Sequence, residues 1–176
     1  MSKVTWNLDP AHSELGFKVK HMMVANVSGH FSDFSVSATS EDEGFSNPEI
    51  NFSAKTASVK TGQEPRDGHL QGADFFDSAN HPEMTFTSTK MEKLGDDQFK
   101  LIGDLSIRGT KKTVSLDVEF GGIGKDPYGN TKAGFSISGK IKRSDFGLNW
   151  NAALEAGGVL VSDEVRINSE IQLVKA

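Results

Sequence analysis

The chain has 176 residues and a formal net charge of -5 at pH 7, and 36% of its residues are hydrophobic while 24% are charged. This length and the absence of a linker-like stretch predict one domain over residues 1–176, and the acidic balance argues against nucleic acid as a partner. The sequence has no cysteine, which excludes disulfides, thiolate metal sites and cysteine nucleophiles.

The first ten residues, MSKVTWNLDP, contain no apolar segment behind the lysine. They are therefore interpreted as mature sequence, and the expected location is cytoplasmic as the sequence is written, or periplasmic if a leader has been removed. No stretch approaches the ~20 consecutive apolar residues that cross a bilayer, so no transmembrane segment is expected.

Apolar and polar residues alternate along most of the chain, which is typical of half-buried strands. A change of phase between Phe31 and Phe34 predicts a bulge near Asp33 that redirects one strand. The glycine-rich residues 121–124 are interpreted as a hairpin turn, and DPYGN at 126–130 as another turn. The alternating stretches are residues 14–20, 27–38, 50–54, 84–87, 99–107, 114–120, 135–140 and 165–173.

Helical structure is expected in one place, a short segment near residues 64–80. Asp74 followed by Asp77 resembles a helix N-cap with an acidic partner three residues later. Pro82 then stops the helix, because the residue before a proline is pushed out of the helical region.

About eight strands linked mainly by hairpins predict an all-β fold, an eight-stranded antiparallel up-and-down barrel that is lipocalin-like; a sandwich is the alternative. The interior of such a barrel is either filled or holds one small ligand. The chain has 12 Phe against one Tyr and two Trp, which predicts a dry interior with few hydrogen bonds. An unbroken strand over residues 27–38 would span roughly 40 Å, which predicts a deep and narrow lumen.

Two segments place an arginine and an aspartate ahead of large apolar residues, and we expect them to close the ends of the barrel. The first begins at Arg66 and the second at Arg143. Each arginine either neutralises a nearby aspartate and anchors a loop, or holds an anionic or carbonyl head group at the mouth with its planar donors. The candidates for head-group binding are Arg66, His69 and Arg143.

The five histidines do not show the spacing of two on a strand, or of three or four on a helix, that brings metal ligands together. No dinucleotide loop, phosphate-binding loop or nucleophile elbow is present. We therefore expect no metal, no catalytic residue and no enzyme activity. The alternative is a hydrolase or metal-dependent enzyme that uses His69, His81 and Asp67.

Several long motifs resemble the YceI-like family, whose members are lipocalin-like in fold and associated with binding polyisoprenoids. They follow one another in order over nearly the whole chain. The motifs are WNLDPAHSELGFKVKH at 6–21, GHFSDF at 29–34, RDGHLQGADFFDSANHPEMTF at 66–86, GDLSIRGTKKTVSLDVEF at 103–120 and RSDFGLN at 143–149.

The resemblance implies an eight-stranded barrel with a helix at one end and an elongated apolar tunnel. The tunnel is expected to hold a long prenyl chain, such as a quinone tail or a prenyl phosphate, or another long-chain lipid or amide. Phe75 and Phe76 and the run from Asp145 to Leu148 are expected near its lumen. The family implies no catalytic residue to transfer, and many relatives carry a secretory leader that this chain does not show.

The expected function is therefore that of a soluble binding protein that stores or transports a hydrophobic long-chain molecule. No cofactor is expected beyond this ligand. Exposed barrel edges of two copies could pair, so a homodimer is possible. The expected ligand-binding residues are Phe17, Phe31, Phe34, Leu70, Phe75, Phe76, Phe86, Leu105, Phe135, Ile137, Phe146, Leu148 and Trp150.

Overall fold

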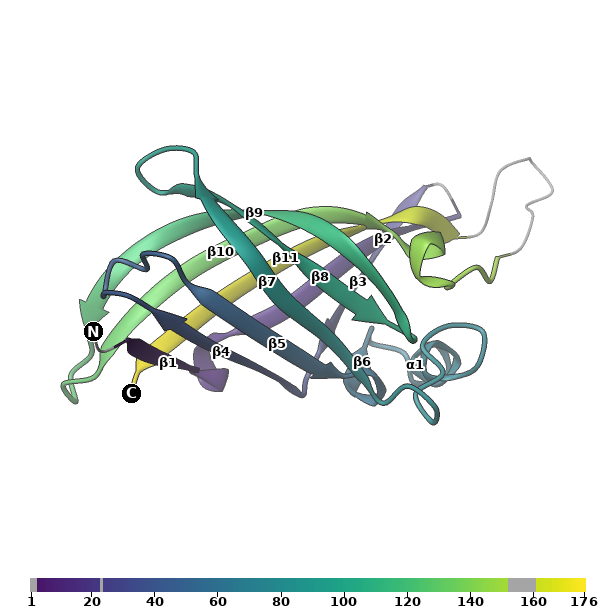
Figure 1. The fold of residues 1–176 in the computed structure, drawn as a ribbon. Helices are drawn as coiled ribbons and strands as arrows, with labels where there is room; N and C mark the ends of the chain where they lie inside the picture. The colour runs from purple at the N-terminus through teal and green to yellow at the C-terminus, as the bar shows by residue number, and fades with distance from the viewer. Residues whose placement is uncertain (1–2, 23, 152–160) are drawn as a thin grey trace.

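The computed structural model describes residues 3–22, 24–151 and 161–176, and β-strands dominate these ranges (Figure 1). The strands are β1 (Val4–Leu8), β2 (Glu14–His21), β3 (Ala25–Phe31), β4 (Phe34–Ser40), β5 (Glu49–Lys55), β6 (Val59–Lys60), β7 (Glu83–Lys93), β8 (Gln98–Ile107), β9 (Thr110–Lys125), β10 (Thr131–Lys142) and β11 (Val161–Lys175). The helix α1 (Glu64–Gln71) and three short 3-10 helices, Pro10–His12, Thr56–Ser58 and Arg143–Phe146, lie between them.

The strands form an antiparallel barrel that is closed by pairing of β1 with β11. β1 and β2 both run along β11, with Leu8 opposite Leu173 and Glu14 opposite Glu170, so they are two parts of one interrupted strand. β3 with β4, and β5 with β6, are interrupted strands of the same kind. The barrel therefore has eight walls that follow one another in chain order, and the predicted eight-stranded up-and-down barrel is confirmed.

The predicted bulge near Asp33 corresponds to the break between β3 and β4. The backbone carbonyl of Asp33 accepts a hydrogen bond from the Lys55 backbone N–H at 2.9 Å, and the Ser32 N–H donates to the Ser58 carbonyl at 3.1 Å. The break turns the wall while its polar backbone groups stay paired. The wall is therefore not the unbroken strand that the sequence suggested.

Residues 121–124 do not form the expected hairpin turn. They lie inside β9, where Phe120 is opposite Phe135 and Gly122 is opposite Gly134, so Gly121 is an extra residue in the ladder. Gly122 has φ 106°, a backbone conformation that glycine adopts without steric cost. The two glycines thus make a β-bulge that bends a long strand, and the chain reverses only at residues 126–130.

The helix α1 lies within the expected segment but occupies only its first half. It ends at Gln71, before Gly72, and the expected helix start at Asp74 is wrong because residues 73–76 form turns. Asp77, the expected acidic partner three residues later, has φ 50°, which lies outside the right-handed helical region. No helix in the described part of the chain is long and apolar enough to cross a membrane.

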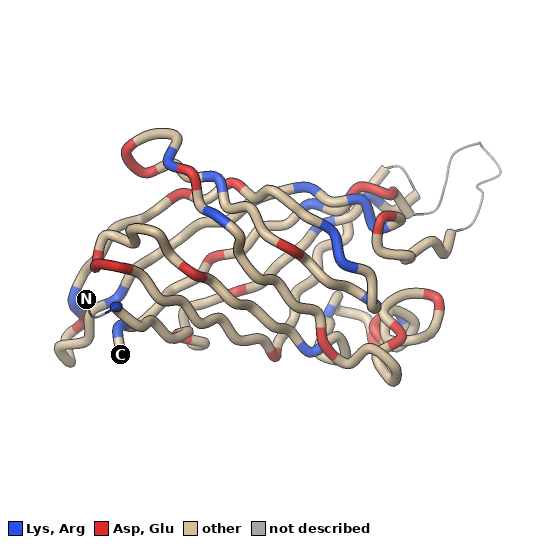
Figure 2. Tube along the Cα trace, in the orientation of Figure 1, with Lys and Arg blue, Asp and Glu red and all other residues tan. Residues whose placement is uncertain are grey.

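The helix and the chain termini lie at opposite ends of the barrel (Figure 1). Figure 2 shows lysine and arginine interspersed with aspartate and glutamate along the strands. Apolar residues of the alternating stretches face inward along most of the walls, and their side chains form a single buried cluster inside the barrel. This arrangement follows from the period of two, because successive side chains of a strand point to opposite faces.

The two arginine-containing segments do not close opposite ends, as we expected, because both lie at the α1 end. The Trp150 ring lies 4.7 Å from the His69 ring and 5.5 Å from the Phe75 ring, measured between centroids. The reason is the direction of the walls: the segments follow the third and the seventh wall, and alternate walls of an up-and-down barrel run the same way.

The opposite end of the barrel is closed by Phe45, in the loop between β4 and β5. Its ring stacks on Trp6 at 4.5 Å and meets Phe135 edge-on at 4.8 Å. Phe45 is buried, and its backbone has φ 61°, a conformation that is uncommon for residues other than glycine. The carboxylate of Asp42 supports this loop by accepting hydrogen bonds from the Gly44 and Ser46 backbone N–H groups.

Candidate functional site

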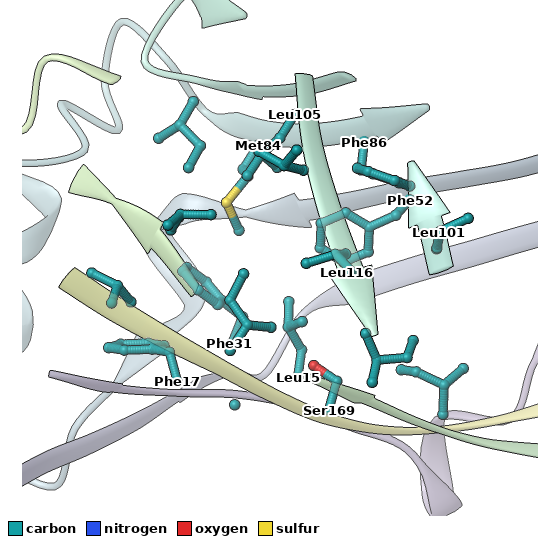
Figure 3. A pocket seen from close by; sticks show the side chains of 18 of the residues that line it. Leu15, Phe17, Phe31, Phe52, Met84, Phe86, Leu101, Leu105, Leu116 and Ser169 are labelled. Atoms are coloured by element: carbon teal, nitrogen blue, oxygen red, sulfur yellow. The ribbon is translucent and has the colours of Figure 1, made fainter. Parts of the chain in front are cut away.

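An apolar cavity with a volume of about 240 Å³ lies inside the barrel, and side chains from the walls and from the segment after α1 line it. Figure 3 shows aromatic and aliphatic side chains of several strands converging on this space. A dry cavity of about 150 Å³ with similar lining is enough to take up benzene. The interior is therefore hollow, and it can accommodate a slender apolar ligand.

Most of the residues expected to bind a ligand contribute to the lining. Phe31 and Phe76 meet edge-on with ring centroids 5.6 Å apart, so the segment after α1 packs directly on the barrel wall. The residues that the sequence indicated and that line the cavity are Phe17, Phe31, Leu70, Phe75, Phe76, Phe86, Leu105, Phe135, Ile137, Arg143 and Leu148.

Five of the indicated residues lie outside the lining. Phe34 packs beside Phe52 with ring centroids 6.4 Å apart, and Phe146 is buried away from the cavity. Trp150 packs against His69 and Phe75 and is not part of the lining. Arg66 and His69, two of the three head-group candidates, do not line the cavity either.

Many lining residues were not among those indicated by the sequence, although the signal for most of them was present in its alternating pattern. They occupy the same inward phase of the alternating stretches as the residues that were indicated. Phe45 is different, because it lies in a loop without periodicity and its inward position follows only from the closed barrel. The lining residues missed include Leu15, Phe45, Phe52, Met84, Leu101, Leu116, Ile167, Ser169 and Ile171.

Hydrogen bonds from the barrel hold the segment after α1 in place. The Arg108 guanidinium donates from Nη1 to the backbone carbonyl of Phe75 at 3.0 Å. Thr56 is fully buried, and its hydroxyl lies 2.8 Å from the Ser78 hydroxyl and 2.9 Å from the His81 carbonyl oxygen. These contacts fix the phenylalanines over the end of the cavity, so the segment acts as a lid. The name lid is used below for α1 together with the segment that follows it, residues 64–82.

Arg66 and Asp67 anchor the lid through Thr61, which precedes α1. Asp67 is buried, and its Oδ1 accepts hydrogen bonds from the Thr61 backbone N–H at 2.8 Å and from the Thr61 hydroxyl at 2.5 Å. Arg66 donates from Nε to the Thr61 hydroxyl and from Nη2 to the Thr61 carbonyl, both at 2.7 Å. The two charges therefore meet at one threonine and fix the start of the helix.

Arg143 fills a similar structural role with its guanidinium buried at the α1 end. Burial lowers the pKa of the Arg143 guanidinium from its ordinary value, and the nearby Asp163 carboxylate opposes that shift. The group uses four of its five N–H donors on backbone carbonyl oxygens. The acceptors are the carbonyls of Ser162 at 2.9 Å, Leu148 at 2.6 Å, Trp150 at 2.9 Å and Val161 at 3.1 Å.

The residues of the alternative enzymatic site have separate partners. His69 pairs with the Asp74 carboxylate at 2.8 Å, while Asp67 is bonded to Thr61. His81 lies beside Gly109, where a Cβ would come within 3.1 Å of its ring. Among the described residues, no group of three or more histidine, aspartate or glutamate side chains could hold a metal ion.

Solved structures share this fold over almost the whole chain. BcnA of Burkholderia cenocepacia matches with a TM-score of 0.81 and 25% identity, covering 94% of this chain and 98% of that one. The YCEI protein of Campylobacter jejuni matches with a TM-score of 0.76 and 38% identity, covering 96% of both chains. A polyisoprenoid binding domain from Saccharophagus degradans has a TM-score of 0.67 at 17% identity, covers 97% of this chain and 98% of that one, and shows likeness of fold alone.

Curated sequences agree with these structures. A UPF0312 protein of Staphylococcus epidermidis is 34% identical over 168 residues, which are 95% of each chain, and a UPF0312 protein of Staphylococcus aureus is equally similar. The model of the YceI-like domain matches residues 6–173, so the resemblance seen in the sequence is confirmed. The chain therefore belongs to the YceI-like domain family.

Proposed function

We propose that this protein binds a long-chain isoprenoid, or a similar lipid or amide, lengthwise inside the barrel, and that it stores or transports this molecule. The observation that carries the proposal is the apolar cavity, which extends from the phenylalanines of the lid to Phe45 at the far end. The name of the Saccharophagus degradans domain, a polyisoprenoid binding domain of the same fold, supports the choice of ligand class.

The energetics of such a complex depend on apolar contact along the chain of the ligand. Burial of each CH₂ group contributes about 0.8 kcal/mol, so several prenyl units suffice for strong binding. For larger ligands the net gain falls toward about 0.3 kcal/mol per atom, because ordering of the ligand and imperfect fit oppose it. Affinity is therefore expected to rise with chain length more than with hydrogen bonding.

The experiment uses the purified protein, its Phe76→Asp variant and the control Tyr128→Asp. Phe76 lines the cavity, whereas Tyr128 is 89% exposed in the turn between β9 and β10. Organic extraction followed by mass spectrometry identifies any bound lipid, and uptake of an added prenyl alcohol is measured by the same method. The expected result is uptake by the wild-type protein and the control but not by Phe76→Asp, with circular dichroism unchanged in all three.

Two results would contradict the proposal. One is a wild-type protein that carries no lipid and takes up no prenyl chain after extraction. The other is equal uptake by Phe76→Asp and wild type, because a carboxylate without a partner inside the cavity must oppose binding of an apolar chain.

A further inference from the structure

Ser169 is a polar residue among aliphatic residues of β11 that line the cavity. It lies opposite Leu15 on β2 and Ile137 on β10, is 4% exposed and lines the cavity. Figure 3 shows its hydroxyl pointing from the strand into the space between the apolar side chains. The other residues of β11 that line the cavity are Val161, Val165, Ile167, Ile171 and Leu173.

The Ser169 hydroxyl has no hydrogen-bond partner. Among the described residues, its Oγ is the one buried side-chain nitrogen or oxygen atom left without a partner. A hydroxyl removed from water without a compensating hydrogen bond destabilises the fold, and alanine at this position would avoid that cost. Packing of the barrel therefore does not explain a serine here.

The other buried hydroxyls in the described ranges, those of Ser40 and Thr56, are bonded, which sets Ser169 apart. Ser40 accepts a hydrogen bond from the Trp6 indole N–H at 3.1 Å and donates to the Asp42 carbonyl at 2.6 Å. Thr56 bonds to the lid through Ser78 and the His81 carbonyl, as described above. Each of these hydroxyls fixes a loop, whereas the Ser169 hydroxyl faces the cavity.

We infer that Ser169 is a specificity-determining residue that binds one neutral oxygen-containing group of the ligand, a hydroxyl or a carbonyl, inside the barrel. The inference rests on the proposed function, because it requires the cavity to hold a lipid. A serine hydroxyl can donate one hydrogen bond and accept two, so it serves a ligand hydroxyl or carbonyl equally well. The ligand therefore carries its polar group within the cavity and not only at the mouth.

The charge of the lining restricts this group to a neutral one. Among the residues that the structure describes, Arg143 is the one charged residue that lines the cavity, and backbone carbonyls take four of its five N–H donors. A phosphate or carboxylate next to Ser169 would have no cation to compensate the loss of water, at a cost of several kcal/mol per ion. The head group of a prenyl phosphate is thus excluded from the position beside Ser169.

The position of Ser169 along β11 also sets where the hydrocarbon lies. Ser169 is opposite Leu15 and Val161 is opposite His21, six residues apart on β2, so at ~3.3 Å per residue the strand runs roughly 20 Å from Ser169 to Val161 at the lid end. It runs only roughly 13 Å from Ser169 to Leu173, toward Phe45. The larger part of an apolar chain bound next to Ser169 therefore extends toward the lid.

The test uses three probes with the same tail: geranylgeraniol, its hydrocarbon counterpart without the hydroxyl, and geranylgeranyl phosphate. Two pairs of proteins are compared. The first pair is the wild type and Ser169→Ala. The second pair is Ser169→Thr and Ser169→Val, whose side chains have the same shape and differ only in the hydroxyl. We expect Ser169→Ala and Ser169→Val to bind the alcohol about two- to tenfold more weakly than their hydroxyl-bearing counterparts, the range that one hydrogen bond gives. Binding of the hydrocarbon and of the phosphate is expected to be unchanged within each pair.

The outcomes separate this inference from the proposed function. If the wild type binds none of the three probes, the proposed function fails. If it binds them but the alcohol loses no affinity in Ser169→Ala and Ser169→Val, the role of Ser169 is overturned while the lipid-binding function stands. An equal loss for the alcohol and the hydrocarbon would also overturn it, because the effect would then come from packing.

Thermal unfolding of the lipid-free protein gives a second readout. Removal of a buried hydroxyl without a partner is expected to raise the unfolding midpoint of Ser169→Ala above that of the wild type. With geranylgeraniol bound, the difference is expected to shrink or reverse, because the wild type gains a hydrogen bond that the variant lacks. A lower midpoint of the lipid-free variant would contradict the inference.

Discussion

The ring of Phe17 covers Gly29 on the neighbouring strand so closely that a Cβ at residue 29 would come within 2.4 Å of the ring's Cζ. The two residues are directly opposite each other in the pairing of β2 with β3. A glycine at this position lets the ring lie against the wall, and the space that the ring would otherwise occupy remains part of the cavity.

Substitution of Gly29 is therefore expected to reduce the cavity. In Gly29→Ala the new methyl group displaces the Phe17 ring, and we expect weaker uptake of prenyl alcohols together with a loss of stability of about 1–3 kcal/mol. Gly134→Ala is the control, because no atom lies within 4 Å of the added Cβ. Equal uptake by Gly29→Ala and Gly134→Ala, measured by mass spectrometry after loading, would show that the close contact does not shape the cavity.

Arg143 is expected to contribute to stability more than to ligand binding. Arg143→Met leaves four backbone carbonyls without their donor, and we expect a loss of about 2–5 kcal/mol in the free energy of unfolding. Arg143→Lys should recover only part of it, because an ammonium cannot reach acceptors spread around a planar guanidinium. The exposed Arg166→Met serves as control, with a change within about 0.5 kcal/mol, and chemical denaturation measures all three variants.

Thr61 links the charges of the lid to the barrel, so Thr61→Val tests the anchor with little change of shape. Arg66 and Asp67 each lose a hydrogen bond, and we expect a destabilisation of about 1–3 kcal/mol. We also expect faster release of bound lipid and faster hydrogen exchange in the lid, since its opening becomes easier. Thr113→Val removes an exposed hydroxyl bonded to Asp104 and should change neither property. Unchanged release from Thr61→Val would indicate that lipid leaves by another route.

The ion pair of Asp9 with Lys132 predicts a loss of stability in acid. Lys132 donates to the Asp9 carboxylate at 2.7 Å and holds the pKa of Asp9 below its ordinary 3.8, with a smaller contribution from His12, while burial opposes the shift. Because the pKa is lower in the folded state, the pair stabilises the protein above about pH 4 and is lost as the pH falls through the folded pKa. Lys132 also lies 3.6 Å from the Asp126 carboxylate, whose pKa is lowered mainly by the Asn130 backbone N–H.

The measurement is the unfolding midpoint of the wild type and of Asp9→Asn between about pH 7 and pH 2. Asp9→Asn is expected to be less stable than the wild type at neutral pH, and the difference is expected to close as the medium is acidified below about pH 4. Asp96→Asn, an exposed carboxylate in the turn between β7 and β8, is the control. A constant difference at all pH values would mean that Asp9 acts through packing and not through its charge.

Much of the barrel could be predicted from local pattern, because the period of two alone decides which side chains share a face. Phe17, Phe86 and Phe135 were placed inward for this reason, and the break at Asp33 was visible as a change of phase. The turn expected at residues 121–124 was wrong, because glycine permits a bulge as readily as a turn and the pairing with β10 decides between them.

The positions of the lid and of the far end were decided by tertiary structure. The sequence shows Arg66 and Asp67 as neighbouring opposite charges. Their convergence on Thr61 depends on the fold of the segment before α1. The inward position of Phe45 arises only because loop residues must fill the end of a closed cylinder.

The sequence by itself determined that the protein is built from antiparallel strands around an apolar interior, since alternation and the abundance of phenylalanine are local properties of the chain. Only the tertiary structure decided that the interior is hollow and that the Ser169 hydroxyl has no partner there. The empty volume and the missing partner both depend on how side chains from walls that are distant in sequence pack together. The sequence of a single strand does not determine that packing.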